Sequence, residues 1–357
     1  MSIIVHERPG VYTGYDVSSV TSGAAGTKVV GVAARAASGT ENTPVLLTGR
    51  AAGTAAFGAD PAGTPGMAAL LDLLFANGAA KVIAVRVGDK GTEADYRAAF
   101  DALALRDDVY VEICDSADLT VQQALRDSVQ ACGENRRERI AVVGGGSGET
   151  VSALITRAAG LNSERVLLVA PEVLDKNGAP LPAVYAAAAV AGVIAVSGDP
   201  AVPLNGAALD GLGGVSTVYT DNDIDALVRG GVTPLESVGG TTSPVRGVTT
   251  RTTTGGAADT TWRELTTILI VDDVISSVRD ALRAKFTRAK NTDQSRGAIR
   301  SQVIVELEKK VAAQVIDSYR EVTAAADTDD PTVCVVSFSF AVAHGLNQIY
   351  LTAHIAV

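Results

Sequence analysis

The glycine-rich stretch from Arg139 to Glu149 is the part of this sequence best suited to chemistry. Its order, RIAVVGGGSGE, predicts a strand, a tight turn at Gly144–Glu149 and the start of a helix. Backbone amides at a helix start can hold a phosphate group. However, the stretch lacks a Gly-Lys-Ser/Thr sequence, and its glycines do not have the Gly-x-Gly-x-x-Gly spacing. We therefore interpret it as an ordinary strand-to-helix turn, with a nucleotide- or dinucleotide-binding α/β enzyme as the alternative.

The other reactive residue types do not form a catalytic or metal-binding set. The histidines are His6, His344 and His354, and no cysteine or carboxylate falls at metal-ligand spacing from them. Ser147 lacks the Gly-x-Ser-x-Gly frame of a nucleophile elbow. The three scattered cysteines, an odd number, are interpreted as reduced thiols of a cytoplasmic product. We expect no catalytic residues, no metal and no cofactor.

Composition excludes several classes of partner. The chain has 357 residues, 47% of them hydrophobic, and a net charge of −10, which argues against a general nucleic-acid binder. No apolar run reaches the roughly 18 residues of a membrane span. The N-terminus shows no secretion signal, so we expect a cytoplasmic product.

Strand and helix patterns alternate through the first part of the chain, which predicts an α/β domain with a largely parallel sheet. The predicted strands are Lys28–Ala34, Thr43–Thr48, Lys81–Val87, Val109–Ile113, Arg139–Val143 and Arg165–Val169. The predicted helices are Gly66–Asn77, Glu93–Leu105, Leu119–Ala131, Glu149–Ala159 and Pro182–Val196.

The pattern changes after Gly206, and the last part of the chain predicts an α+β domain. Val215–Tyr219 is a predicted strand, Asn222–Val228 a short helix, and Thr241–Ala258 a Thr/Gly-rich run near which we place the domain boundary. Further predicted elements are a strand at Thr261–Ile270, a helix that starts at Asp272 and Asp273, a helix at Ser295–Ala313 and a strand at Val315–Val322. We divide the chain into an extended arm (1–22), an outer α/β domain (23–240) and a C-terminal domain (241–357).

Both ends of the chain have the pattern of strands. Ile3–Val5 and Val11–Tyr15 are short β-prone segments near the N-terminus. At the other end, Thr332–Val342 and Ile349–Val357 alternate apolar with smaller or polar residues, and Ala343–Asn347 supplies a turn. We predict a terminal hairpin. An edge strand with unpaired backbone groups favours pairing with another chain.

The stretch from Arg279 to Lys310 is basic within an acidic protein. It contains nine Lys and Arg residues against four Asp and Glu residues. Such a basic belt indicates an acidic partner surface. The alternative is a solvated helical face with internal ion pairs.

Several stretches together resemble the tail sheath proteins of contractile phages and phage-tail-like bacteriocins. The resemblance covers nearly the whole chain and lies in the order and spacing of motifs that are individually weak. The motifs are Arg8–Tyr12, Asn42–Thr48 followed by Ala56–Gly58, Lys81–Val87, Pro180–Val193, Gly230–Val232, Trp262, Asp272–Phe286 and the terminal segment Leu351–Val357.

The resemblance implies a structural subunit, not an enzyme, that polymerises as stacked, six-fold rings around an inner tube. Contraction would drive the tube through a cell envelope. The subunit would be made in the bacterial cytoplasm, and its final location would be the tail sheath of a virion or bacteriocin. The implied partners are other copies of the chain, the tube protein, and baseplate and tail terminator proteins, with no direct nucleic-acid contact and no membrane insertion. A different self-assembling shell or surface-layer subunit is a further alternative.

The resemblance also assigns roles to particular residues. The expected inter-subunit arm contains Ile3, Ile4, Val5, Val11 and Tyr12, and the expected inter-subunit terminal strand contains Ile349, Leu351, Ala353, Ile355 and Val357. The residues expected to face the tube are Arg300, Lys309 and Lys310.

Overall fold

Eight strands form one sheet in the computed structural model, which describes residues 28–61 and 66–354. Their order across the sheet is β11 (Thr241–Pro244), β10 (Thr233–Val238), β6 (Val166–Ala170), β5 (Ile140–Gly144), β4 (Val109–Cys114), β1 (Val29–Ala34), β3 (Val82–Arg86) and β2 (Val45–Leu47). The six inner strands pair in parallel, and only β2 and β11 pair antiparallel, at the two edges. The prediction of a largely parallel sheet is confirmed.

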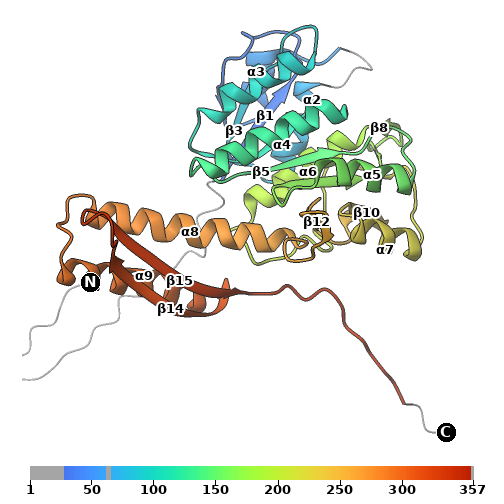
Figure 1. The fold of residues 1–357 in the computed structure, drawn as a ribbon. Helices are drawn as coiled ribbons and strands as arrows, with labels where there is room; N and C mark the ends of the chain where they lie inside the picture. The colour runs from blue at the N-terminus through green and yellow to red at the C-terminus, as the bar shows by residue number, and fades with distance from the viewer. Residues whose placement is uncertain (1–27, 62–65, 355–357) are drawn as a thin grey trace, which may run out of the picture.

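Helices cover both faces of this sheet. The strands β1, β5 and β6 are buried along their whole length, as is typical of parallel strands with helices on both sides. One face packs against α2 (Met67–Ala76) and α6 (Ala183–Val196), and the other against α3 (Glu93–Ala104), α4 (Leu119–Glu134), α5 (Val151–Leu161) and α7 (Asp221–Arg229). Figure 1 shows these helices around the sheet. The helix α1 (Arg50–Phe57) is absent from the sequence-based prediction.

Short strands complete the α/β unit. The strands β7 (Val173–Leu174), β8 (Pro180–Leu181) and β9 (Gly214–Val215) form a three-stranded sheet. A two-stranded hairpin forms from β12 (Thr253–Thr254) and β13 (Ala257–Ala258). Of the predicted strand Val215–Tyr219, only Val215 lies in a strand, β9.

The rest of the chain forms a second, smaller core. The long helix α8 (Leu265–Phe286) leaves the α/β unit, and α9 (Asp293–Ala312), β14 (Ile316–Ala326) and β15 (Cys334–Val342) pack along it (Figure 1). The first turns of α8 place Leu265 and Ile268 in a core of the main sheet. Its later turns place Val274 and Val278 in the second core. One continuous helix thus connects the two cores.

The predicted strand at Thr261–Ile270 is wrong, and Asp272 and Asp273 do not start a helix. Residues from Leu265 onward are helical, and both aspartates lie inside α8. The β-branched residues of this stretch favour a strand locally. Leu265, Ile268, Leu269 and Asp272 nevertheless repeat at helical spacing and are all buried, so tertiary packing overrides the local preference.

The predicted terminal hairpin is also wrong within the described residues. The strand β15 pairs antiparallel with the preceding β14, and residues 343–354 form no strand. The acidic loop between the two strands makes the turn, because Asp327 Oδ1 accepts hydrogen bonds from the amides of Asp329 (2.9 Å) and Asp330 (3.0 Å). The alternation within β15 is as predicted, with every second residue more buried.

The division of the chain at residue 240 stays a prediction. The structure places β11, which follows that position, at the edge of the main sheet. It also buries Thr249 and Thr250 completely in the α/β unit.

Candidate assembly site

The turn Gly144–Glu149 is filled by its own side chains. The Glu149 carboxylate accepts hydrogen bonds from Arg157 Nε (2.9 Å) and from the Gly146 amide (2.9 Å). These hydrogen bonds, chiefly those from Arg157, hold the pKa of Glu149 below its usual value, and the charged carboxylate already occupies the Gly146 amide of the turn. A Cβ at Gly144 would lie 2.3 Å from the Val184 amide nitrogen, so this glycine lets α6 approach the sheet. Nothing in this geometry supports the enzyme alternative.

The candidate metal and thiol residues remain apart. No group of three or more His, Cys, Asp or Glu side chains converges within residues 28–61 and 66–354. His344 and His354 are exposed, Cys114 and Cys132 are buried, and none of the cysteines in this part forms a disulfide. His6 lies outside the described residues. None of the described helices is long and apolar enough to cross a membrane.

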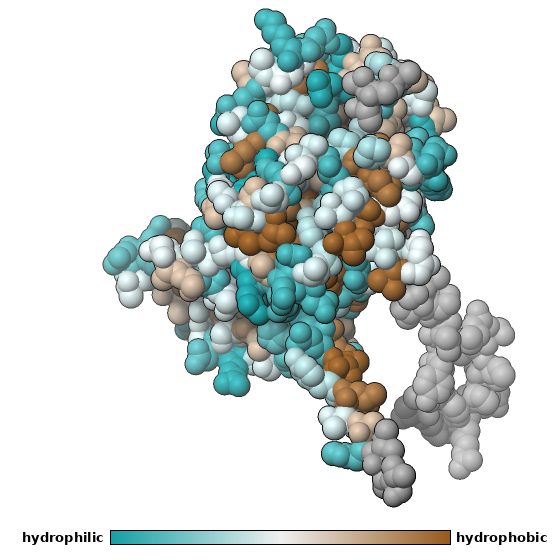
Figure 2. Space-filling model, turned by 90° about the vertical axis from the view of Figure 1, so that its right-hand side faces the viewer, coloured by the Kyte–Doolittle hydropathy of each residue, from teal (hydrophilic) through white to brown (hydrophobic). Residues whose placement is uncertain are grey.

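The segment that follows β15 is extended and exposes apolar side chains. Ile349 is 80% and Leu351 92% exposed, and Leu346 and Tyr350 are exposed beside them. Figure 1 shows the segment leading away from the body, and Figure 2 shows brown side chains where it projects. Ala353 belongs to the same segment and is exposed. Exposed apolar residues that are gathered in this way mark an interaction surface.

The root of this segment is held by the α/β unit. Asn205 Nδ2 donates a hydrogen bond to Asn347 Oδ1 at 2.8 Å. A Cβ at Gly345 would lie 3.0 Å from Pro203 Cγ, so the backbone passes close to that ring. These contacts lead the segment away from its own sheet. The remaining residues expected at subunit contacts, Ile3, Ile4, Val5, Val11, Tyr12, Ile355 and Val357, lie outside the described residues.

The structure separates the three cations expected to face a tube. Lys309 is 64% exposed and pairs with Glu306 one turn away on α9 (2.9 Å). Lys310 pairs with Asp273 of α8 (2.6 Å) and is mostly buried. Arg300 Nε donates to the Val322 carbonyl of β14 at 2.7 Å. Two of the three therefore make contacts that hold the small core together.

Other members of the basic belt are also paired within the chain. Arg279 Nη1 lies 3.0 Å from Glu138 Oε2 in the α/β unit, and Arg296 pairs with Asp293. Asn291, in the loop between α8 and α9, donates to the carbonyls of Pro331 and Val333 and so places this loop beside the acidic loop of Asp327–Asp330. The belt is thus partly neutralised by its own chain, as the second interpretation of its sequence proposed.

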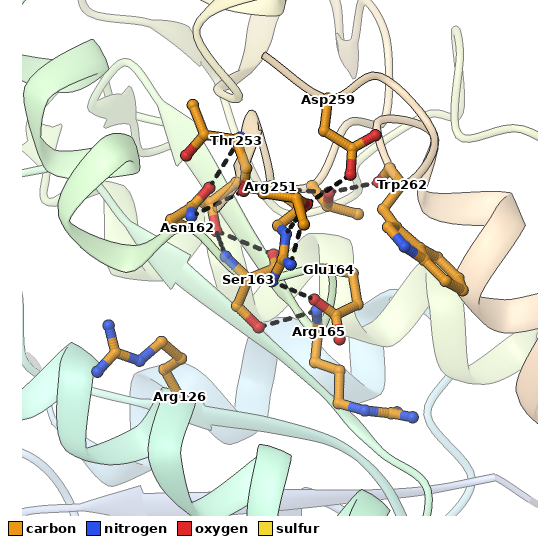
Figure 3. A network of polar contacts seen from close by, with 12 residues as sticks. Arg126, Asn162, Ser163, Glu164, Arg165, Arg251, Thr253, Asp259 and Trp262 are labelled. Atoms are coloured by element: carbon orange, nitrogen blue, oxygen red, sulfur yellow. Dashed lines mark hydrogen bonds and ion pairs between the residues drawn. The ribbon is translucent and has the colours of Figure 1, made fainter. Parts of the chain in front are cut away.

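A polar junction joins the Thr/Gly-rich run to the α/β unit (Figure 3). Asn162, at the left-handed C-cap of α5, accepts from the amides of Thr252 (3.0 Å) and Thr253 (3.2 Å) and donates to the Thr253 carbonyl (3.1 Å). Thr250 exchanges two hydrogen bonds with Ser163, each 3.0 Å long. The threonines therefore anchor the chain where it passes from the sheet toward α8.

The connection between α5 and β6, residues 162–165, also contacts α8 directly. Arg165 forms a two-pronged ion pair with Asp272 of α8, at 2.7 and 2.9 Å. Both side chains are nearly buried. Burial raises the pKa of Asp272, and the hydrogen bonds from Arg165 oppose that shift. In the sequence, Asp272 lies at helical spacing from Leu265, Ile268 and Leu269, which could have indicated that it is buried. Its partner Arg165 is 107 positions away, and no sequence pattern connects the two residues.

We expect Asp272→Ala to lower the free energy of unfolding by about 3 kcal/mol, because it leaves the Arg165 guanidinium buried without its partner. Urea unfolding measures this change. Asp72→Ala is the matched control: its pair with Arg50 is exposed and should contribute less than about 0.5 kcal/mol. Equal effects of the two substitutions would show that the junction does not depend on this pair.

Two family models match consecutive parts of the chain. A model of the phage tail sheath protein central domain matches residues 89–250, and a model of the phage tail sheath C-terminal domain matches residues 257–356. A curated tail sheath protein of Bacillus phage SP01 is 32% identical over 228 residues. That match covers 62% of this chain but only 39% of the relative's length.

Solved structures share the fold over almost the whole chain. A sheath tail protein from Desulfitobacterium hafniense matches with a TM-score of 0.71 and 13% identity, covering 93% of this chain and 100% of that one. The helical sheath of the anti-feeding prophage in its contracted state matches with a TM-score of 0.72 and 16% identity, covering 98% and 99% of the two chains. At these identities, the structural matches establish the fold.

Proposed function

Because this chain belongs to the family of phage tail sheath proteins, we propose that it is a structural subunit of a contractile sheath. Copies would polymerise around an inner tube, and contraction of the polymer would drive the tube through a cell envelope. The exposed apolar segment of Leu346, Ile349, Tyr350 and Leu351 is the observation that carries this proposal. A monomer would leave these apolar side chains in water, whereas a polymer can bury them against the sheet of a neighbouring subunit.

The proposed partners follow from the same function. They are other copies of the chain in six-fold rings, the tube protein, and baseplate and terminator proteins. The subunit would be made in the cytoplasm and end in the sheath of a phage tail or phage-tail-like particle. The N-terminal residues Ile3, Ile4, Val5, Val11 and Tyr12 would add a second donated segment.

The junction supports a stiff connection between the α/β unit and α8. Hydrogen bonds of Asn162 and Thr250 fix the Thr/Gly-rich run that leads to α8, and the ion pair of Arg165 with Asp272 fixes α8 itself. A change of state would then be absorbed at the segments between subunits more readily than inside one subunit.

Negative-stain electron microscopy of the purified protein tests the proposal. The expected result is long hollow helical tubes, alone or around a co-expressed tube protein. Particles without helical order, or specific binding of ATP or NAD without tubes, would contradict it. Flat sheets or closed shells would instead favour a different self-assembling subunit.

We propose Lys309 as a cation that faces the tube, and expect Lys309→Glu to reduce tube-loaded sheaths severalfold. The reversal changes the electrostatic free energy of the contact between subunit and tube by about 1 kcal/mol, and every copy in the sheath contributes the same change. Counting particles by electron microscopy measures it, with Lys81→Glu on the exposed surface of the α/β unit as the control. Lys310 is less suitable, because its reversal would break the pair with Asp273 that connects α9 to α8, whereas the pair of Lys309 with Glu306 lies within α9. Wild-type numbers of loaded sheaths from Lys309→Glu would exclude this assignment.

A further inference from the structure

A cleft of about 1010 Å³ lies between the N-terminal edge of the main sheet and α8. Its wall contains Lys28, which directly precedes β1, Tyr110 of β4, Glu138 before β5, and residues of α8 from Asp272 to Arg283. We infer that residues 22–27 of the same chain lie extended in this cleft, and that one of their backbone carbonyls accepts a hydrogen bond from the Tyr110 hydroxyl. The inference concerns the inside of a single subunit, so it goes beyond the proposed function and does not depend on it.

The position of Lys28 requires the residues before it to start at this cleft. Residues 1–27 lie outside the described residues, but Thr27 is joined to Lys28, and their Cα atoms are about 3.8 Å apart. The Lys28 side chain is fixed, because its Nζ donates to the Ser197 carbonyl at 3.0 Å and lies 4.4 Å from the centre of the Tyr110 ring. A second cavity beside Lys28 is lined mainly by apolar side chains and measures about 90 Å³, which is too small for six residues.

The Tyr110 hydroxyl is a buried donor that needs an acceptor. It is enclosed by protein and has no hydrogen-bond partner in the described part of the chain. Burial, with the charges of Asp272 and Asp273, raises the pKa of Tyr110, so the hydroxyl keeps its proton and remains a donor. Lys28 Nζ also has donors left after its bond to Ser197. Buried donors without acceptors are costly, and the backbone carbonyls of a passing segment would satisfy both groups.

The cleft suits an uncharged segment of small residues. Most charges in its wall are already paired within the chain, among them Glu138 with Arg279 (3.0 Å) and Asp273 with Lys310 (2.6 Å). The cleft therefore offers hydrogen bonds more than unpaired charges. Residues 22–27, SGAAGT, contain no charged residue and no side chain larger than that of threonine. Their backbone can approach the wall closely and leaves no charge buried without a partner.

The length of the segment matches the length of the cleft. The helix α8 lines the cleft from Asp272 to Arg283, which corresponds to about 18 Å of helix. Burial lowers the pKa of Lys28 and the charge of Asp273 opposes this shift, so Lys28 lies near the Asp273 end. Six extended residues span at most about 20 Å. Residues 22–27 can therefore follow the cleft from Lys28 to Arg283, and the free part of the N-terminal arm would end at Thr21.

Disulfide trapping in the full-length protein tests the inference. Ser276→Cys places a thiol in the wall of the cleft, and Ala24→Cys or Ala25→Cys places a second thiol in the segment. Neighbouring residues of an extended segment point to opposite sides, so one of these two positions should form a disulfide with position 276. Ser277→Cys is the matched control, because it is the next residue of α8 and does not line the cleft. Cys334, which is half-buried, is replaced by Ser in every variant.

The disulfide should form at least about tenfold faster with Ser276→Cys than with Ser277→Cys, because the cleft holds the two thiols together. Mass spectrometry of the digested protein measures the rate, which should not depend on protein concentration. Adding Tyr110→Phe should slow the reaction severalfold by removing the hydrogen bond. Tyr350→Phe, which removes a hydroxyl from an exposed side chain, should leave the rate unchanged.

Equal rates with the two helix positions, or no disulfide with either, would overturn the location of the segment. A disulfide that forms only between chains would assign the cleft to a second copy and also overturn it. An unchanged rate with Tyr110→Phe would overturn the assigned hydrogen bond. These outcomes are separate from those of the proposed function, because they are measured on single subunits. Tubes without the disulfide would contradict only this inference, and the disulfide without tubes would contradict only the sheath proposal.

Discussion

A chain that ends at Gln348 is expected to fold like the full-length protein and to form no sheath. The deleted part includes Ile349, Tyr350 and Leu351, which are all at least 80% exposed and so contribute little to the fold. The contacts of Gly345 and Asn347 with the α/β unit are retained. The melting temperature should therefore change by less than about 2 °C, because surface changes of this kind stay within about 0.5 kcal/mol.

Assembly should nevertheless be lost, because each neighbour would lack the exposed apolar segment that we propose it buries. Thermal unfolding and electron microscopy of the same sample measure the two effects. The paired substitution of Ile349 and Leu351 by Ser should also prevent assembly, whereas Thr352→Ser, on the opposite face of the donated strand, should not. Deletion of residues 2–13 is also expected to leave a folded subunit that cannot assemble. Tubes of normal length from the truncated chain would refute the role of the terminal segment.

Glu112→Ala should lower the free energy of unfolding by about 3–5 kcal/mol, because it leaves a fully buried guanidinium unpaired. Glu112 Oε1 lies 2.6 Å from Arg139 Nη1, and neither side chain is exposed. Arg139 also donates to the carbonyls of Leu103 (3.1 Å) and Arg106 beyond the end of α3. Burial raises the pKa of Glu112, and Arg139 opposes the shift. The pair thus links β4, β5 and α3 in the middle of the main sheet.

Urea denaturation measures this prediction, and two variants control it. Replacing Glu112 by Leu together with Arg139 by Met removes both charges at similar volume, and should cost much less than Glu112→Ala alone. Glu93→Ala removes an exposed partner of Arg97, and should cost less than about 0.5 kcal/mol. If the double variant were as unstable as Glu112→Ala, then lost packing, and not the unpaired charge of Arg139, would account for most of the lost stability.

The sequence by itself determined six of the eight strands of the main sheet, all except β10 and β11, and the alternation within β15. Both are local patterns: continuous apolar runs between helical segments indicate strands buried on both faces, and period two indicates a strand with one buried face. The predicted strands and helices of this domain accordingly lie close to their predicted positions, whereas β10, β11 and α1 were not predicted. The family was also accessible from the sequence, because the order and spacing of motifs are properties of the chain alone.

Tertiary structure decided which partners these elements take. The strand β15 was predicted correctly and its hairpin partner wrongly, because two β-prone neighbours compete and the loop of Asp327–Asp330 favours β14. Thr261–Ile270 became partly helical because packing against the main sheet outweighs local propensity. The contacts of Arg300 with the Val322 carbonyl and of Lys310 with Asp273 were also decided by the tertiary structure, since the partners of a charge are groups distant in sequence and close in space.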